Sequence, residues 1–151
     1  MMLTAYRLSL KKYRARAFTG DGARRAGGRW NPRGFPVVYT SATLSLAALE
    51  FLVHLGSTQD APELVSFRVE IEERLVQHLR RPKNWRRLKL RDTRELGKSW
   101  LEEASSPVLC VSSFVVPNGD NFILNPLHPQ FGRLKISAAE DFVLDARLYE
   151  K

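Results

Sequence analysis

The sequence predicts an α+β domain with mostly antiparallel strand pairing. Helix and strand patterns follow one another in a mixed order, without the regular alternation that parallel α/β folds show. Residues 65–71 alternate apolar and polar side chains, as in a strand with one buried face. Residues 46–55 are predicted to form a helix that is almost wholly apolar. With 151 residues and 44% hydrophobic content the chain can bury one core, so we expect a single domain over residues 1–151.

The chain before this helix is predicted to contain two strands joined by a long loop. Residues 3–8 form the first strand, and a basic, glycine-rich loop follows over residues 11–28. A loop of this length in a compact domain favours a functional role. Residues 31–34 (NPRG) predict a turn that opens a short apolar strand over residues 36–40.

The apolar helix contains only two polar side chains between residues 46 and 55, Glu50 and His54. They stand at positions i and i+4 and therefore share one narrow face. Either this face meets solvent, or it points into a cleft where a buried carboxylate needs cations or donors beside it. The candidate caps are Ser41, Thr43 and Ser45 at the start and Gly56 at the end.

The second half of the chain adds one helix and several strands. Residues 72–90 are charged and broken by Pro82, so we expect them to be mostly irregular. Asp92 and Glu95 stand three residues apart, as in a capping box, before a helix that ends near Glu103. A β-prone run over residues 107–116 contains Ser112 and Ser113. Shorter strand candidates cover residues 122–124, 133–136 and 142–149.

The composition indicates a soluble cytoplasmic protein. Cys110 is the only cysteine, which excludes an internal disulfide and suits a reducing compartment. The N-terminus lacks the long apolar segment of a signal peptide, and the longest apolar segment, residues 44–55, is too short to span a bilayer.

The net charge of +8 is concentrated in two segments. Residues 1–33 hold nine Lys and Arg against Asp21 alone, and residues 74–94 hold nine more against Asp92 alone. Such clusters indicate an anionic partner, which could be a nucleic acid, a dinucleotide pyrophosphate or an acidic protein surface. For residues 74–94 a solvated basic face is an equal alternative, and we assign this segment provisionally to a partner surface.

Familiar catalytic and metal-binding motifs are missing. The sequence has no P-loop, no G-x-G-x-x-G turn and no G-x-S-x-G nucleophile elbow. His54, His78 and His128 stand apart from one another and from Cys110, so we expect no metal site.

Motifs in order along the chain resemble the RES-domain toxin family. Arg7 lies on the first strand, GGRWN covers residues 27–31, and Tyr39 ends the second strand. Glu50 follows in LEFLVH, and Ser113, Asn121 and the NP and HP pairs at residues 125–126 and 128–129 come later. Phe142 and the DARL of residues 145–148 complete a similarity that covers nearly the whole chain.

This resemblance implies an ADP-ribosyltransferase-like fold with a split mixed sheet that grips NAD, and a toxin that depletes NAD or transfers its ADP-ribose. NAD would then be a substrate, and we expect no bound cofactor. The family's toxins are neutralised by an antitoxin with a helix-turn-helix (Xre-like) domain, so DNA would be reached only through that partner. The acceptor (water, phosphate or a protein side chain) and the oligomeric state, monomer or homodimer, stay open.

The residues carried over by motif position suit cleavage of a nicotinamide riboside bond. This reaction develops oxocarbenium character at the ribose, as in glycoside hydrolysis, and a carboxylate such as Glu50 would stabilise it. Arg7 and Arg29 would hold the two phosphates, because the guanidinium fork matches their oxygens. Tyr39 would stack on the nicotinamide, and Ser113 would donate a hydrogen bond. The family often has a proline before this serine, so Ser112 is the alternative to Ser113.

Two other classes of function stay open on the residues alone. Eighteen basic residues in two segments also suit a nucleic-acid-binding or RNA-cleaving protein, although no base-reading motif accompanies them. A non-catalytic module could use the same charges to dock an acidic protein.

Overall fold

The computed structural model describes residues 1–55 and 61–150. Its strands are β1 (Met2–Leu10), β2 (Val38–Ser41), β3 (Leu64–Glu72), β4 (Val76–His78), β5 (Val108–Ser112), β6 (Asp120–Leu124), β7 (Lys135–Ile136) and β8 (Glu140–Phe142). The α-helices are α1 (Asp21–Ala26), α2 (Leu44–Leu55) and α3 (Leu90–Glu103). Short 3-10 turns are η1 (Lys11–Arg16), η2 (Glu73–Leu75), η3 (Trp85–Arg87), η4 (Phe131–Arg133) and η5 (Ala146–Leu148).

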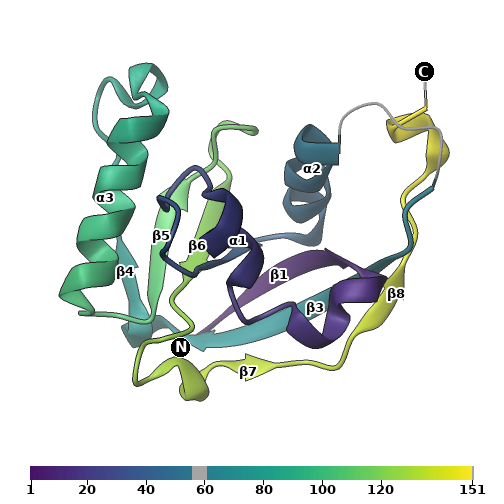
Figure 1. Cartoon of the computed structure of the whole chain (residues 1–151), viewed down its shortest axis with the longest axis horizontal. Helices are drawn as coiled ribbons and strands as arrows, with labels where there is room; N and C mark the ends of the chain where they lie inside the picture. The colour runs from purple at the N-terminus through teal and green to yellow at the C-terminus, as the bar shows by residue number, and fades with distance from the viewer. Residues whose placement is uncertain (56–60, 151) are drawn as a thin grey trace.

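The strands form one curled sheet in the order β4-β5-β6-β2-β1-β3-β7, with β8 also paired to β3 (Figure 1). The β4–β5 pair is parallel, and the remaining pairs among the described strands are antiparallel. The predicted α+β class and the mixed, mostly antiparallel sheet are therefore confirmed.

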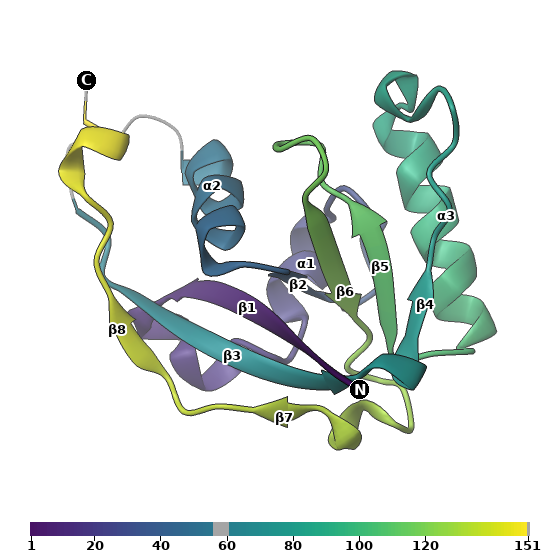
Figure 2. The same cartoon turned by 180° about the vertical axis from the view of Figure 1, so that it is seen from behind.

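The sheet is split between β1 and β2. β1 pairs with β3 along its whole length, from Met2 opposite Glu72 to Leu10 opposite Leu64. By contrast, β1 meets β2 at one register pair, Tyr6 opposite Ser41. The two halves diverge from this seam, with β1 and β3 on one side and β2, β6 and β5 on the other (Figure 2).

The hydrophobic core follows the alternation that the sequence predicts for β3. Val65, Phe67, Val69 and Ile71 are buried, whereas Arg68 between them is exposed. Val69 and Ile71 join the main cluster with Val108, Phe122 and Leu124 from the other half of the sheet. The core therefore ties the two halves together beneath the seam.

Helix α2 covers β1 and β2 near the seam (Figure 1). Of the three candidate caps, Thr43 is the one observed, since its Oγ1 accepts a hydrogen bond from the N–H of Leu46 at 3.0 Å. Phe51, Leu52 and Leu55 pack against the cluster around Leu64 and Tyr149. The predicted end of this helix at Gly56 lies outside the described residues.

Several predicted element boundaries were wrong. Helix α3 begins at Leu90, two residues before the expected start, because the Asp92 carboxylate accepts from the N–H of Lys89 at 2.9 Å and so sits inside the first turn. The long loop over residues 11–28 contains η1 and α1, and the irregular segment over residues 72–90 contains β4.

The strand expected over residues 142–149 ends at Phe142. Asp145 then caps the η5 turn, because its Oδ1 accepts from the N–H of Arg147 at 2.9 Å. The β-prone run over residues 107–116 is a strand only as far as Ser112. Within the described parts of the chain, no helix combines the length and the apolar character needed to cross a membrane.

Candidate functional site

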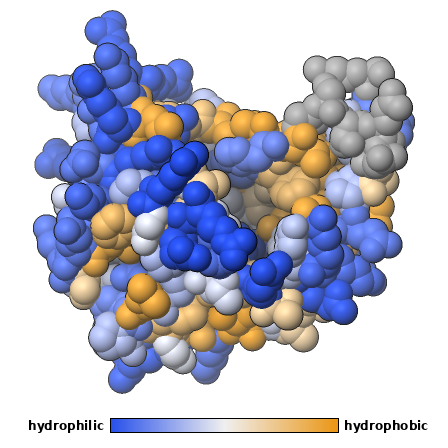
Figure 3. All heavy atoms as spheres, viewed as in Figure 1, coloured by the Kyte–Doolittle hydropathy of each residue, from blue (hydrophilic) through white to orange (hydrophobic). Residues whose placement is uncertain are grey.

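A cavity of about 480 Å³ lies at the seam of the sheet. Its walls come from β1, the segment that contains η1 and α1, β2, α2 and the loop between β5 and β6. Figure 3 shows the hollow near the centre of this face, with hydrophilic residues on the α1 side and hydrophobic residues on the α2 side. The cavity exists because the two halves of the sheet diverge where β1 and β2 share one register pair.

Glu50 lines this cavity, and its carboxylate accepts hydrogen bonds from two side chains, of which Asn121 also lines the cavity. Its Oε1 accepts from Ser113 Oγ at 2.7 Å and from Asn121 Nδ2 at 2.9 Å. Asn121 is itself oriented by Ser41, whose Oγ donates to Asn121 Oδ1 at 3.0 Å. Both of these bonds use Oε1, and among the described residues no hydrogen bond to the second oxygen, Oε2, is observed.

The Ser113 side chain is locked by the turn that follows it. Ser113 is 1% exposed, and its Oγ accepts from the N–H groups of Val115 and Val116 at 3.0 and 3.1 Å. With both lone pairs used, the hydroxyl has one proton left, and that proton points to Glu50. The arrangement therefore fixes the rotamer of Glu50 before any ligand arrives.

Arg7 brings a buried positive charge to the same cavity. Its Nε donates to the Ala17 carbonyl at 2.6 Å and its Nη1 donates to the Tyr39 carbonyl at 3.0 Å. Burial lowers the Arg7 pKa to about 10, so the group stays protonated at neutral pH. Among the ion pairs of the described residues none involves Arg7. Because carbonyls compensate only part of this charge, the site favours an anionic ligand.

Arg29 and Tyr39 complete the cavity wall on the α1 side. The Arg29 guanidinium lies over the Phe114 ring, with 4.4 Å between Cζ and the ring centroid. The Tyr39 hydroxyl donates to Asn31 Oδ1 at 2.5 Å and accepts from the N–H of Trp30 at 3.0 Å. Burial is the main cause that raises the Tyr39 pKa to about 12, so the hydroxyl is neutral. The Tyr39 ring, not its hydroxyl, is therefore the part available to a ligand.

Residues 27–30 (the GGRW segment), which include Arg29, are hydrogen-bonded to α3. Thr93 Oγ1 donates to the Arg29 carbonyl at 2.5 Å, and Arg94 Nε donates to the Gly28 carbonyl at 2.8 Å. Gly97 lets the Trp30 backbone approach so closely that a Cβ on Gly97 would lie 1.7 Å from the Trp30 carbonyl oxygen. Helix α3 does not line the cavity, yet it sets the position of one wall.

Comparison with known proteins identifies the family of this chain. The RES domain model matches residues 4–145. The chain belongs to the RES-domain family. A curated relative named Toxin Res, from Yersinia enterocolitica, is 39% identical over 153 residues that cover 98% of this chain and 99% of the relative. A Toxin Res of Photorhabdus laumondii is 36% identical and covers 95% of each chain.

A more distant relative and a solved structure were also matched. A protein of Sphingobium sp. named Prs ADP-ribosylating toxin is 28% identical to this RES domain over 93% of the chain and 92% of the relative. A structure described as the M. tuberculosis MbcT–MbcA toxin–antitoxin complex contains a chain that superposes with a TM-score of 0.69 at 18% identity. The match covers 95% of this chain and 85% of that chain, and it shows a shared fold.

Four of the five predicted site residues of the RES domain line one cavity. They come from four different places in the chain: Arg7 from β1, Arg29 from the loop after α1, Tyr39 from β2 and Glu50 from α2. Ser113 stands behind Glu50 and contacts it without lining the cavity. Ser112, the alternative, lies instead beside a small apolar hollow with Trp30 and Trp85.

Asn121 and Ser41 were not predicted to take part in this site. These residues face each other across β2 and β6, and their side chains continue the bond network from Glu50. Little in the sequence indicates a functional role for these two residues, because a single polar residue on a strand usually forms a local hydrogen bond. Only the register between two strands eighty residues apart shows that they meet.

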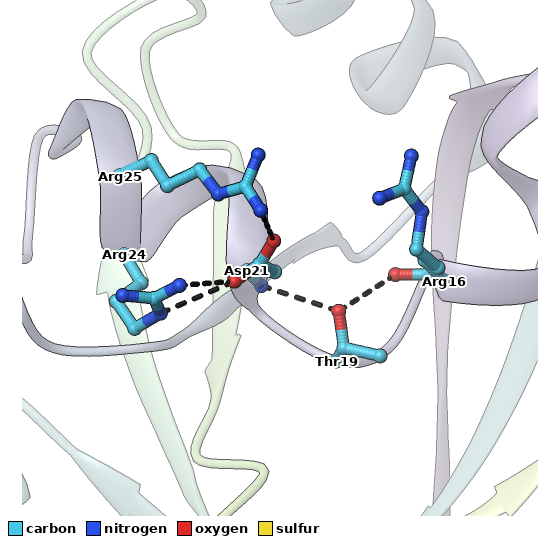
Figure 4. Close-up of polar contacts among 5 residues, drawn as sticks. All are labelled: Arg16, Thr19, Asp21, Arg24 and Arg25. Carbon is cyan, nitrogen blue, oxygen red and sulfur yellow. Dashed lines mark hydrogen bonds and ion pairs between the residues drawn. The ribbon is translucent and has the colours of Figure 1, made fainter.

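The positive charge of residues 1–33 is partly neutralised by Asp21, the acidic residue of that segment. Asp21 at the start of α1 pairs with Arg24 at 2.6 Å and with Arg25 at 2.9 Å (Figure 4). The hydrogen bond from Arg24 is the main cause that lowers the Asp21 pKa. Arg16 makes no contact with Asp21 in Figure 4 and lines the cavity. The cavity is therefore lined by three arginines that come from β1, η1 and the GGRW segment.

The described residues contain no group of three or more His, Cys, Asp or Glu side chains placed to hold a metal ion. The site presents the oriented Glu50 carboxylate, the Asp21 carboxylate paired with Arg24 and Arg25, arginines that line the cavity, and aromatic side chains of Tyr39, Trp30 and Phe114. This set can bind an anionic ligand that also carries flat rings, and it can stabilise a positive charge that develops next to Glu50.

Proposed function

We propose that this RES domain is a toxin that consumes NAD by cleaving the bond between nicotinamide and ribose. One observation carries the proposal: Glu50 is clamped by Ser113 and Asn121 in a cavity that also contains the buried guanidinium of Arg7. The Arg7 guanidinium suits the pyrophosphate of NAD. The carboxylate of Glu50, already oriented in the free protein, suits the positive charge that develops on the ribose during the reaction.

The chemical step assigns a role to each side chain. The bond between ribose C1′ and the nicotinamide nitrogen breaks, and its electron pair leaves with nicotinamide as a neutral molecule. The positive charge that remains on the ribose is stabilised by Glu50, while Arg7 and Arg29 hold the phosphates and the Tyr39 ring stacks on nicotinamide. Ser113 and Asn121 keep Glu50 in the orientation that this step needs.

The acceptor decides whether the toxin is a glycohydrolase, a phosphorylase or an ADP-ribosyltransferase. Water, phosphate and a protein side chain would each attack the same ribose carbon. The relative named Prs ADP-ribosylating toxin supports ADP-ribosyl transfer. We therefore propose ADP-ribosyl transfer or NAD degradation in the cytoplasm, with NAD as a substrate and no resident cofactor.

A cognate antitoxin is part of the proposal. The fold match to a toxin in a toxin–antitoxin complex supports such a partner. An antitoxin with an Xre-like helix-turn-helix domain fits the resemblance of the sequence to the RES family.

The test is nicotinamide release from NAD by the purified protein. Glu50→Gln keeps the side-chain volume but removes the charge, so we expect turnover to fall about a hundredfold or more with an unchanged thermal melt. Parallel reactions with added phosphate or a cell extract identify the product as ADP-ribose, its 1-phosphate or a labelled protein. If Glu50→Gln retains turnover within a few-fold of wild type, the carboxylate is not catalytic and the proposed mechanism fails.

A further inference from the structure

A second charged surface lies on η3 and the residues around it, away from the cavity. We call it the η3 surface, and its basic residues are Arg80, Arg81, Lys83, Arg86, Arg87, Lys89 and Arg91. All seven are exposed, and no Asp or Glu occurs between Glu73 and Asp92. None of the seven lines the cavity, so the proposed NAD chemistry does not account for them.

Little of this charge is neutralised within the molecule. Among the ion pairs of the described residues, Arg91 with Asp92 is the one that includes a member of the η3 surface, and its 3.9 Å separation is long. Seven exposed cations with one weak ion pair repel each other, which favours an external polyanion.

Trp85 organises the centre of the η3 surface. The guanidinium groups of Arg81 and Arg86 lie over its ring, at 4.8 and 5.0 Å from the centroid. Trp85 in turn meets Phe114 edge to face, with centroids 5.2 Å apart. Stacking restricts both arginines, so less side-chain entropy is lost when they bind phosphate oxygens.

We propose that the η3 surface binds the phosphate backbone of nucleic acid, without preference for base sequence. Five of the seven cations are arginines, whose planar fork matches phosphate. Hot spots of protein interfaces are enriched in Trp and Tyr as well as Arg. Here arginines cover Trp85, and between residues 80 and 91 the exposed large apolar side chain is Leu90, at 44%. This inference replaces the provisional assignment of residues 74–94 to a partner surface, and it departs from the expectation that DNA is reached only through an antitoxin.

The test measures binding of fluorescent duplex DNA by anisotropy, with two unrelated sequences, between 50 and 200 mM salt. We expect equal affinity for both sequences and a steep linear fall of log K with log salt. The variant replaces four cations outside the Trp85 stack, Arg80→Gln, Lys83→Gln, Arg87→Gln and Lys89→Gln. Loss of four phosphate contacts should reduce the slope by about 3 to 4.

A matched variant removes the same charge elsewhere, by Lys12→Gln, Arg14→Gln, Arg33→Gln and Lys135→Gln, all at exposed residues. It should keep most of the slope, and both variants should keep wild-type melting and nicotinamide release. Equal losses in the two variants would show diffuse attraction and overturn the proposal. The proposal also fails if wild type does not bind DNA at 50 mM salt, or if poly-glutamate binds the η3 surface more tightly than DNA does.

Discussion

Replacing Gly97 by alanine tests whether α3 positions the cavity wall. The added Cβ would lie 1.7 Å from the carbonyl oxygen of Trp30 and 2.7 Å from its carbonyl carbon. Protein Cβ atoms essentially never come closer than 3.0 Å to such atoms, so α3 and the GGRW segment must separate by at least about 1.3 Å. The separation would strain the hydrogen bonds that join Thr93 and Arg94 to this segment.

The expected change in the free energy of unfolding combines two destabilising contributions and one stabilising contribution. Overpacking costs about 1–3 kcal/mol, and weakening two hydrogen bonds costs about 1 kcal/mol each. Because alanine is more favourable than glycine in a helix interior, the substitution also stabilises the fold by roughly 0.5–1 kcal/mol. We therefore expect Gly97→Ala to lower the free energy of unfolding by about 3 kcal/mol, which is a fall in Tm of roughly 6–12 °C for a chain of this length.

Thermal unfolding followed by circular dichroism measures this difference, with Gly22→Ala as the control. Gly22 also lies in a helix, α1, but a Cβ there has nothing within 4 Å, so its alanine should be neutral or stabilising by up to about 1 kcal/mol. Below its Tm, Gly97→Ala should also release nicotinamide more slowly, because Arg29 moves with the segment. If Gly97→Ala melts at or above the wild-type temperature, the close packing of α3 on Trp30 is refuted.

Three further predictions concern single side chains. Arg7→Ala should weaken NAD binding, measured by calorimetry, more than Lys12→Ala does, because Arg7 lines the cavity and Lys12 does not. Equal, modest losses of affinity in the two variants that disappear at high salt would instead indicate long-range electrostatic attraction by the whole basic surface. Ser113→Ala should lower kcat about tenfold or more, because it removes a hydrogen bond to a charged Glu50, whereas a comparable loss in Ser112→Ala would assign the role to the other serine. Burial raises the Tyr39 pKa from 10.0 to about 12, so the folded state keeps a proton that the unfolded state loses, and the contribution of Tyr39 to stability should fall as pH rises from about 10 to 12. The lowered Arg7 pKa acts in the opposite direction in the same window, so the Tyr39 contribution is measured as the difference in unfolding free energy between wild type and Tyr39→Phe in urea titrations. This difference should decrease from about pH 10 to 12, and a difference that does not change with pH would contradict the assignment.

The sequence predicted the parts of the fold that depend on local patterns. The alternation over residues 65–71 corresponds to β3, and the apolar run up to Leu55 corresponds to α2. It missed β4, because three residues in a charged segment have no periodicity to detect and become a strand only by pairing in parallel with β5. The start of α3 was misplaced because Asp92 is a good N-cap residue by type, yet here it accepts from the N–H of Lys89 as the third residue of the helix.

The candidate site depended on the family resemblance more than on local chemistry. Glu50 on an apolar helix had two readings from the sequence, and only the fold places it in the cavity wall. Local sequence holds no sign that Ser113 and Asn121 converge on the same carboxylate oxygen, because that depends on the register of β2, β5 and β6. The attachment of the GGRW segment to α3 likewise joins residues more than sixty positions apart.

The distance along the chain between Glu50 and its two partners has a consequence for protein synthesis. Ser113 and Asn121 follow Glu50 by 63 and 71 residues, and β2 has no neighbour on that side until β6 has been made. A growing chain therefore carries its carboxylate without the groups that orient it while the next 63 to 71 residues are synthesised. A polypeptide truncated anywhere before β6 would lack an assembled site. A ribosome that stalls early on this message would therefore release a harmless fragment. A partner that recognises the assembled cavity would have nothing to bind until β6 has been synthesised.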